Sequence, residues 1–70
     1  MERFTNIRLT PGAKLRKLRG EKSKNEVAAA IGVSASSYIK YERDERNPSD
    51  HVKQKIADYF GRSVGFIFFD

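Results

Sequence analysis

Apolar residues recur at helical spacing before a glycine in the middle of the chain, and a second helical pattern follows it. Val27, Ala28 and Ile31 fall at i, i+1 and i+4, which places them on one face of a helix. Gly32 can adopt the left-handed conformation that ends a helix at no steric cost. Val33 is apolar within the turn, so we expect it to fill the gap between two helices.

Two serines mark where these helices begin. Ser23 can accept a hydrogen bond from the backbone N–H of Glu26, and the Glu26 carboxylate can return to the Ser23 N–H, which makes a capping box. Ser34 can cap a second helix over residues 35–42. Because a turn this short forces a steep crossing angle, the pattern predicts a helix-turn-helix.

Another helix is predicted before this stretch. Thr10 can cap a helix over residues 11–19, which begins with a proline whose missing N–H does no harm at that position. Leu15 and Leu18, three residues apart, give this helix an inward edge. Gly12 is expected to weaken its start.

A fourth helix is predicted after a polar loop at residues 43–48. Pro48 disfavours helix at the residue before it, and four consecutive charges in the loop have no apolar partner. Ser49 can then cap a helix that Gly61 ends at the left-handed position. Its expected core stripe has the spacing i, i+4, i+7 and i+8 and consists of Val52, Ile56, Tyr59 and Phe60.

The two ends of the chain leave an alternative open. Residues 1–9 alternate imperfectly between polar and apolar, and residues 66–69 are apolar and β-prone, so the ends could pair as a small sheet. Otherwise the last segment is a short helix capped by Ser63. The expected fold is all-α with five helices, short terminal strands being the alternative, and residues 1–10 form an arm before one domain at 11–70.

Taken together, these elements resemble the Cro and lambda-repressor type of helix-turn-helix DNA-binding domain. The resemblance covers about residues 11–68 and implies a homodimer that binds double-stranded DNA at an inverted-repeat operator. Lys24 stands where the family usually has a glutamine that contacts the DNA backbone. The matching elements are Ser23 to Ala28, Ile31 to Ser34, Tyr41 and Glu42, Asn47 to Ser49, and Ile56 to Gly61.

The resemblance also implies structural roles. Arg19 and Glu42 occupy positions that in the family form an ion pair between the first helix and the end of the recognition helix; the alternative is two unrelated surface charges. The other residues assigned to structure are Ala28, Gly32 and Val33, which lie within the two helices and their turn.

The net charge of +5 is concentrated in the same part of the chain. Residues 1–46 hold 11 lysines and arginines against 6 acidic residues, whereas residues 47–70 hold 3 against 3. A basic surface binds phosphates because each neutralised phosphate releases condensed counterions. A solvated basic face would carry the same charge, so the charge supports the DNA-binding interpretation only together with the motif.

Candidate base contacts lie on the outward face of the second helix of the motif. Steps of about 100° per residue separate this face from Tyr38, Tyr41 and Glu42. A serine can bond to several bases, a small apolar side chain can meet a thymine methyl group, and a lysine can reach the acceptors of guanine. The predicted base-facing residues are Ala35, Ser36, Ile39 and Lys40.

A second group is predicted to contact phosphates or is left without a fixed role. Lys24 begins a helix, where free N–H groups and the helix dipole favour a phosphate. Ser37 could instead bond within its own helix, and the arginines beyond the motif could be exposed loop charges. The group comprises Ser23, Lys24, Ser34, Ser37, Arg43 and Arg46.

Other functional classes find no support in the sequence. His51 is the only histidine, there is no cysteine, and no nucleophile, base and orienting group can be assembled. We therefore expect no enzyme activity, metal, cofactor or small-molecule ligand. No apolar run approaches the roughly 20 residues that cross a bilayer, and no signal-peptide pattern is present, so we expect a cytoplasmic, nucleoid-associated protein.

The expected function is sequence-specific binding of double-stranded DNA by a transcriptional regulator, a repressor of the phage or mobile-element type. The main alternative is an antitoxin or a protein-interaction module that uses the same fold to bind a protein partner. Enrichment of one palindrome from randomised duplexes would distinguish them.

Overall fold

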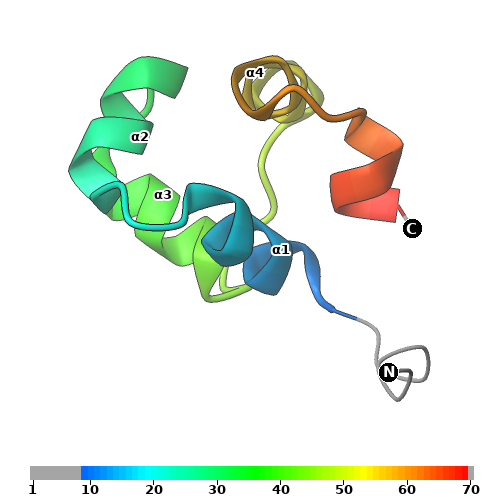
Figure 1. The fold of residues 1–70 in the computed structure, drawn as a ribbon, viewed down its shortest axis with the longest axis horizontal. Helices are drawn as coiled ribbons and strands as arrows, with labels where there is room; N and C mark the ends of the chain where they lie inside the picture. The colour runs from blue at the N-terminus through cyan, green and yellow to red at the C-terminus, as the bar shows by residue number, and fades with distance from the viewer. Residues whose placement is uncertain (1–8, 70) are drawn as a thin grey trace.

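The computed structural model describes residues 9–69, and all of the regular secondary structure within them is helical (Figure 1). This confirms the predicted all-α fold, and the expected arm at residues 1–10 falls almost wholly outside the described range. None of the described helices combines the length and the apolar character that crossing a bilayer requires. In chain order the elements are α1 (Pro11–Arg19), α2 (Lys24–Ile31), α3 (Ala35–Glu42), α4 (Asp50–Phe60) and the π-helical turn η2 (Gly65–Phe69).

Each of the four α-helices begins with a hydroxyl that accepts the backbone N–H of the residue three positions on. This satisfies one of the N–H groups that a helix start leaves without an intrahelical partner. The expected return bond from the Glu26 carboxylate to the Ser23 N–H is not among the hydrogen bonds of residues 9–69. Of the predicted capping box, only the bond from the Glu26 N–H to the Ser23 hydroxyl is therefore formed. The O···N distances are 3.1 Å at Thr10, 3.0 Å at Ser23, 3.0 Å at Ser34 and 3.3 Å at Ser49.

The turn between α2 and α3 has the predicted geometry. Gly32 has φ 94° and ψ 29°, a left-handed conformation, and its N–H donates to the Ala28 carbonyl at 2.8 Å. The Val33 N–H donates to the same carbonyl at 3.0 Å, and the Val33 side chain packs against the core. The turn thus closes α2 and sets the start of α3 against the same core.

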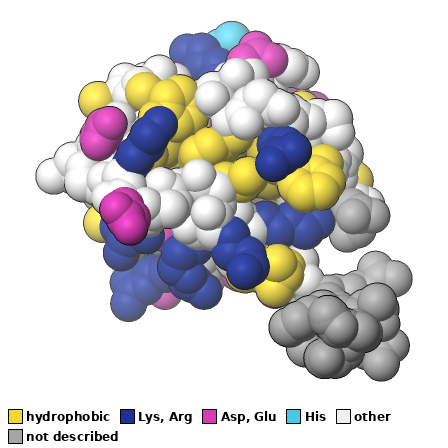
Figure 2. Space-filling model, viewed as in Figure 1, with side chains coloured by type: hydrophobic (Ala, Val, Ile, Leu, Met, Phe, Trp, Pro, Cys, Tyr) yellow, Lys and Arg dark blue, Asp and Glu magenta, His cyan; other side chains and the backbone are white. Residues whose placement is uncertain are grey.

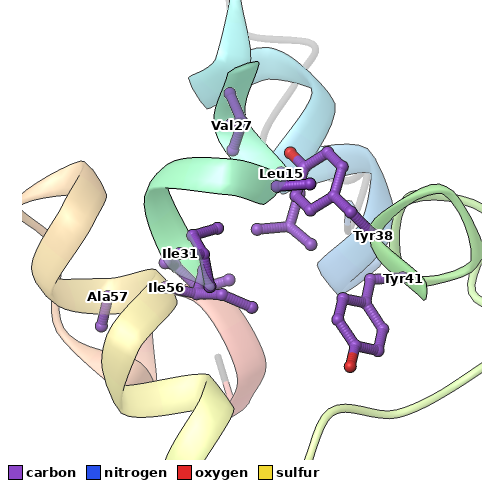
Figure 3. Close-up of a cluster of buried hydrophobic side chains, with 9 residues drawn as sticks. Leu15, Val27, Ile31, Tyr38, Tyr41, Ile56 and Ala57 are labelled. Carbon is purple, nitrogen blue, oxygen red and sulfur yellow. The ribbon is translucent and has the colours of Figure 1, made fainter. Parts of the chain in front are cut away.

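The core lies where the helices meet. α1 and α2 both pack on α3, α2 also packs on α4, and η2 packs on α1 (Figure 1). Figure 3 shows Ile31 of α2 beside Ile56 of α4, and Leu15 of α1 beside Tyr38 of α3. The largest fully buried side chains are Tyr38, Leu15, Ile56, Ile67 and Val27.

The predicted stripe of α4 faces the core, but its apolar burial is greatest at Ile56 and the neighbouring Ala57, which was not predicted to face the core. Ile56 is fully buried, whereas the other predicted members are half-buried against the core. Ala57, the next residue, is buried as well and belongs to the same core cluster. The half-buried members are Val52, Tyr59 and Phe60.

The last segment is helical, so the strand alternative is wrong for residues 66–69. The Phe66 N–H donates to the Ser63 hydroxyl at 3.0 Å, which is the predicted cap, and Ile67 is fully buried. Phe66 and Phe69 remain 46% and 70% exposed. Cations of the same chain lie near their ring centroids: Lys14 and Arg62 each 5.5 Å from Phe66, and Lys53 4.7 Å from Phe69.

Gly12 lies where the start of α1 meets the end of α3. A Cβ atom at this position would lie 2.3 Å from the carbonyl oxygen of Glu42 and 2.8 Å from a carboxylate oxygen of Asp44. Both distances are far shorter than a van der Waals contact. The prediction that Gly12 weakens the start of α1 concerned helix propensity alone. The structure adds a second role, because the missing side chain allows the two helices to meet at backbone level.

Candidate nucleic-acid interface

α3 has one buried and one exposed face, divided as the helical spacing predicts. Tyr38, Tyr41 and Glu42 are buried, with 0%, 7% and 3% of their surfaces exposed. Ser36 and Lys40 are exposed on the opposite face, where their polar groups can donate to base or phosphate oxygens. The structure therefore leaves these two polar residues free of core packing.

The two apolar residues predicted to face bases differ in their surroundings. Ala35 is half-buried and packs against the hydrophobic core, so its side chain is partly used by the fold. Ile39 is half-buried and lies one residue beyond Tyr38 on the helix. Of the four predicted base-facing residues, Ala35 is the one that packs against the core cluster.

A buried ion pair joins α1 to the end of α3. Arg19 Nε donates to Glu42 Oε2 at 2.6 Å, and Arg19 Nη2 donates to Glu42 Oε1 at 3.1 Å. The Arg19 side chain is 15% exposed and the Glu42 side chain 2% exposed. Such a two-point contact between a guanidinium and a carboxylate fixes orientation as well as distance. The ion pair expected from the resemblance is confirmed.

Arg19 and Glu42 each shift the pKa of the other toward the charged form. Burial by itself would raise the pKa of Glu42, but the hydrogen bond from Arg19, the nearby Tyr38 hydroxyl and the charges of Arg19 and Lys24 hold that pKa below its ordinary value. The hydrogen bond to Glu42 likewise raises the pKa of Arg19. Both groups are therefore charged at neutral pH, and each is stabilised by the other.

Tyr38 completes this buried cluster. Within residues 9–69 its hydroxyl is buried without a well-formed hydrogen bond, and it faces the Arg19–Glu42 pair. Burial first, and the Glu42 carboxylate second, raise the pKa of the Tyr38 phenol. The phenol is therefore neutral, and the ring fills the space between α1 and α3 (Figure 3).

The serines predicted to contact phosphates already take part in the caps. Ser23 and Ser34 accept N–H bonds at the starts of α2 and α3, and Ser34 Oγ donates to Ser37 Oγ at 3.1 Å. Ser37 thus has the local hydrogen bond that was left open as an alternative. All three hydroxyls lie at helix N-termini, where the backbone favours an anion.

Three exposed cationic side chains belong to the helix-turn-helix or follow it directly. Lys24 is the first residue of α2 and is exposed, while Arg43 and Arg46 are exposed just beyond α3. Arg43 lies 3.9 Å from Glu45 in a pair that is 64% and 52% exposed, which restrains it little. Figure 2 shows Lys and Arg side chains gathered on the lower left of the face viewed, in the half of the molecule that holds α1 to α3.

Asp44 has a part in this region that was not predicted from the sequence. In the sequence it was one of four consecutive loop charges without an apolar partner, and in the structure its carboxylate accepts hydrogen bonds from the start of α1. The available signal was its place two residues after the predicted end of α3, where left-handed residues commonly follow a helix and Asp tolerates that conformation.

Comparisons with known proteins agree with this geometry. The chain is 37% identical over 51 residues to the cryptic phage CTXphi transcriptional repressor RstR of Vibrio cholerae, a match that covers 70% of this chain and 46% of that protein. The chain thus spans less than half the length of this relative. No solved structure gives a significant match. A family described as Helix-turn-helix matches residues 13–67, and the chain therefore belongs to the Cro and lambda-repressor type of helix-turn-helix DNA-binding domain family.

Proposed function

We propose that this protein is a transcriptional repressor that binds a specific inverted-repeat site in double-stranded DNA as a homodimer. The observation that carries the proposal is α3, which is fixed from inside by Tyr38 and Glu42 while its outward polar residues are exposed. In this motif the second helix enters the major groove and its first residues meet the base edges. The similarity to a phage transcriptional repressor supports the same function.

Within this proposal the contacts divide into two classes. Ser36, Ile39 and Lys40 read base edges from the exposed face of α3, with Ala35 contributing the exposed part of its methyl group. Lys24 and the N-terminus of α2 hold one phosphate. Arg43 and Arg46 hold the backbone beyond the other end of α3. Residues 11–70 form the DNA-binding domain, which acts in the cytoplasm on the nucleoid.

Base reading predicts that Lys40→Ala and Ser36→Ala weaken binding to the selected site much more than binding to random DNA. A good base contact discriminates by about 1 to 3 kcal/mol. The site is first obtained by selection from randomised duplexes, and affinities are then measured by gel shift at fixed salt. Enrichment of a palindrome is expected; selection without enrichment of any sequence would contradict specific binding.

Two controls separate base contacts from general electrostatics. Lys55→Ala removes an exposed lysine of α4 and should leave both affinities nearly unchanged. Lys24→Gln should weaken binding to both duplexes alike and reduce the salt slope by about 0.9. Equal losses on both duplexes for Lys40→Ala would move Lys40 to the phosphate class.

The homodimer is proposed to form through the exposed aromatic residues of η2. Phe66 and Phe69 are large and exposed, and side chains of Lys and Arg lie beside their rings. On the right of the face in Figure 2, the side where Figure 1 places η2, hydrophobic side chains lie next to Lys and Arg side chains. One domain covers one half-site, so a twofold dimer with recognition helices about 34 Å apart matches a palindrome. Phe68 is half-buried against the core and is a poorer candidate.

The dimer predicts that Phe66→Glu and Phe69→Glu each give folded monomers. Placing a carboxylate in an apolar contact leaves it desolvated, so association should weaken by at least tenfold. Analytical ultracentrifugation with and without DNA measures the mass, and far-UV circular dichroism controls for folding. If both variants stay folded and bind the site as dimers with unchanged affinity, this surface is not the interface.

A further inference from the structure

Asp44 has an unusual backbone conformation for its residue type. Among residues 9–69 it is the only residue other than glycine with positive φ, at 60°. Its N–H donates to the Tyr41 carbonyl at 3.2 Å, and the Glu45 N–H donates to the Lys40 carbonyl at 2.9 Å, the pattern of a Schellman motif at the end of α3. Glycine meets this need without strain, so something other than ending the helix favours aspartate here.

The carboxylate of Asp44 supplies that reason. One oxygen, Oδ1, accepts the Gly12 N–H at 2.9 Å, and the other, Oδ2, accepts the Thr10 hydroxyl at 2.7 Å. Both donors belong to the start of α1, where unpaired N–H groups and the helix dipole favour an anion. The side chain therefore ties the end of α3 to the start of α1, 32 residues away in sequence from Gly12.

This tie fixes the backbone from which two arginines extend. Arg43 directly precedes Asp44 and Arg46 follows two residues later, and both side chains are exposed. We propose that Asp44 is a positioning residue for DNA binding, which anchors the loop of residues 43–48 on α1 so that Arg43 and Arg46 are held toward the DNA backbone. This inference rests on the proposed function.

The direction of the change in DNA affinity distinguishes a positioning role of Asp44 from a simple effect of its charge. An acidic residue near phosphates repels them, so charge alone predicts that removing the Asp44 carboxylate strengthens DNA binding. Positioning predicts the opposite, because the loop loses its anchor and the arginines are no longer held against the phosphates. Glu45 offers a matched control, since it is exposed and its carboxylate pairs weakly with Arg43 instead of bonding to α1.

The test compares two isosteric changes that each remove one negative charge, Asp44→Asn and Glu45→Gln, together with Asp44→Gly. Binding to a random-sequence duplex is measured over a range of salt concentrations. We expect Asp44→Gly to bind roughly tenfold more weakly near 0.1 M salt, and the salt slope to fall by about 0.9 for each phosphate that is no longer neutralised. Glu45→Gln is expected to bind as tightly as the unmodified protein or more tightly, and Asp44→Asn more weakly than Glu45→Gln.

A double variant shows whether Asp44 acts through the arginines. Adding Arg46→Gln to Asp44→Gly should cost much less than Arg46→Gln costs alone, because Arg46 of the Asp44→Gly protein no longer holds its phosphate. Urea unfolding followed by circular dichroism identifies the folded variants. Asp44→Asn, whose amide oxygen can still accept the Gly12 N–H, decides the question if Asp44→Gly does not fold.

These measurements distinguish failure of the positioning role from failure of the proposed function. If Asp44→Gly or Asp44→Asn binds as tightly as Glu45→Gln with an unchanged salt slope, or if the losses of the double variant add fully, the positioning role is overturned and the proposed function stands. If the unmodified protein does not bind duplex DNA, the proposed function and the inference built on it both fail.

Discussion

Replacing Arg19 with methionine is expected to destabilise the protein by about 3 kcal/mol at neutral pH, the lower end of the range for breaking a buried ion pair. The change leaves the Glu42 carboxylate, whose side chain is 2% exposed, without its partner of opposite charge. The lower end applies because the Arg19 side chain is 15% exposed and meets some solvent. Urea unfolding followed by circular dichroism measures the loss. For a small domain this is a large part of the total stability.

The same variant should reverse the pH dependence that Glu42 contributes. In the unmodified protein the folded-state pKa of Glu42 lies below the ordinary value of 4.5, so its stabilisation is complete above that pH and is lost as the pH falls through the lowered folded-state pKa. Without Arg19, burial dominates and raises the pKa, so acid then favours the folded state through this group. Unfolding free energies between pH 7 and pH 3 give the two slopes.

Two further variants serve as controls for this prediction. Arg19→Met combined with Glu42→Leu removes both charges and should recover most of the lost stability, because no buried charge remains. Glu21→Gln removes an exposed carboxylate and should change little. An Arg19→Met protein as stable as the original, with the same acid sensitivity, would show that the pair does not hold α1 to α3.

The second large effect is expected for Gly12→Ala, which should destabilise the protein by about 2 kcal/mol or more. Helix propensity alone predicts a gain of about 1 kcal/mol, since alanine favours helix over glycine. The new methyl group, however, would lie 2.3 Å from the Glu42 carbonyl oxygen, a backbone atom that cannot move without separating α1 from α3. The steric effect therefore outweighs the propensity.

Gly61→Ala is the matched control for Gly12→Ala. Gly61 has φ 70° and ψ 32°, the left-handed conformation, with no heavy atom within 4 Å of an added Cβ, so alanine there meets only the strain of that conformation, about 1 kcal/mol. Chemical denaturation of both variants, with two-dimensional NMR spectra to compare their folds, separates crowding from strain. A Gly12→Ala protein more stable than the original would contradict the close approach of the two helices.

Local signals in the sequence were sufficient for the helices and their ends. Thr10, Ser23, Ser34 and Ser49 each cap the helix predicted for them, because capping depends on residues within one turn. The division of α3 into buried and exposed faces follows from helical spacing. The Arg19–Glu42 pair came from the family resemblance, since partners 23 positions apart in the sequence carry no local signal for it.

The features that were not predicted all depend on contacts distant in sequence. Gly12 looked like a weak helix start because the helix it meets lies about thirty residues away. Lys53 is only 7% exposed because aromatic rings of η2 cover it, which the pattern of α4 cannot reveal. The pattern of residues 66–69 left a strand open as the alternative to a short helix, and the burial of Ile67 against the core is a tertiary effect.

The two-sided structure of α3 has a consequence for how such a protein changes over generations. Tyr38, Tyr41 and Glu42 hold the helix in place from its inner side, whereas Ser36 and Lys40 on the outer side pack against nothing in the core. If these residues read bases as proposed, substitutions on the outer side change the preferred DNA sequence with little effect on folding stability. A lineage can therefore acquire a new DNA target through substitutions at a few exposed positions. An engineer can exchange the same outer-side residues without changing the core.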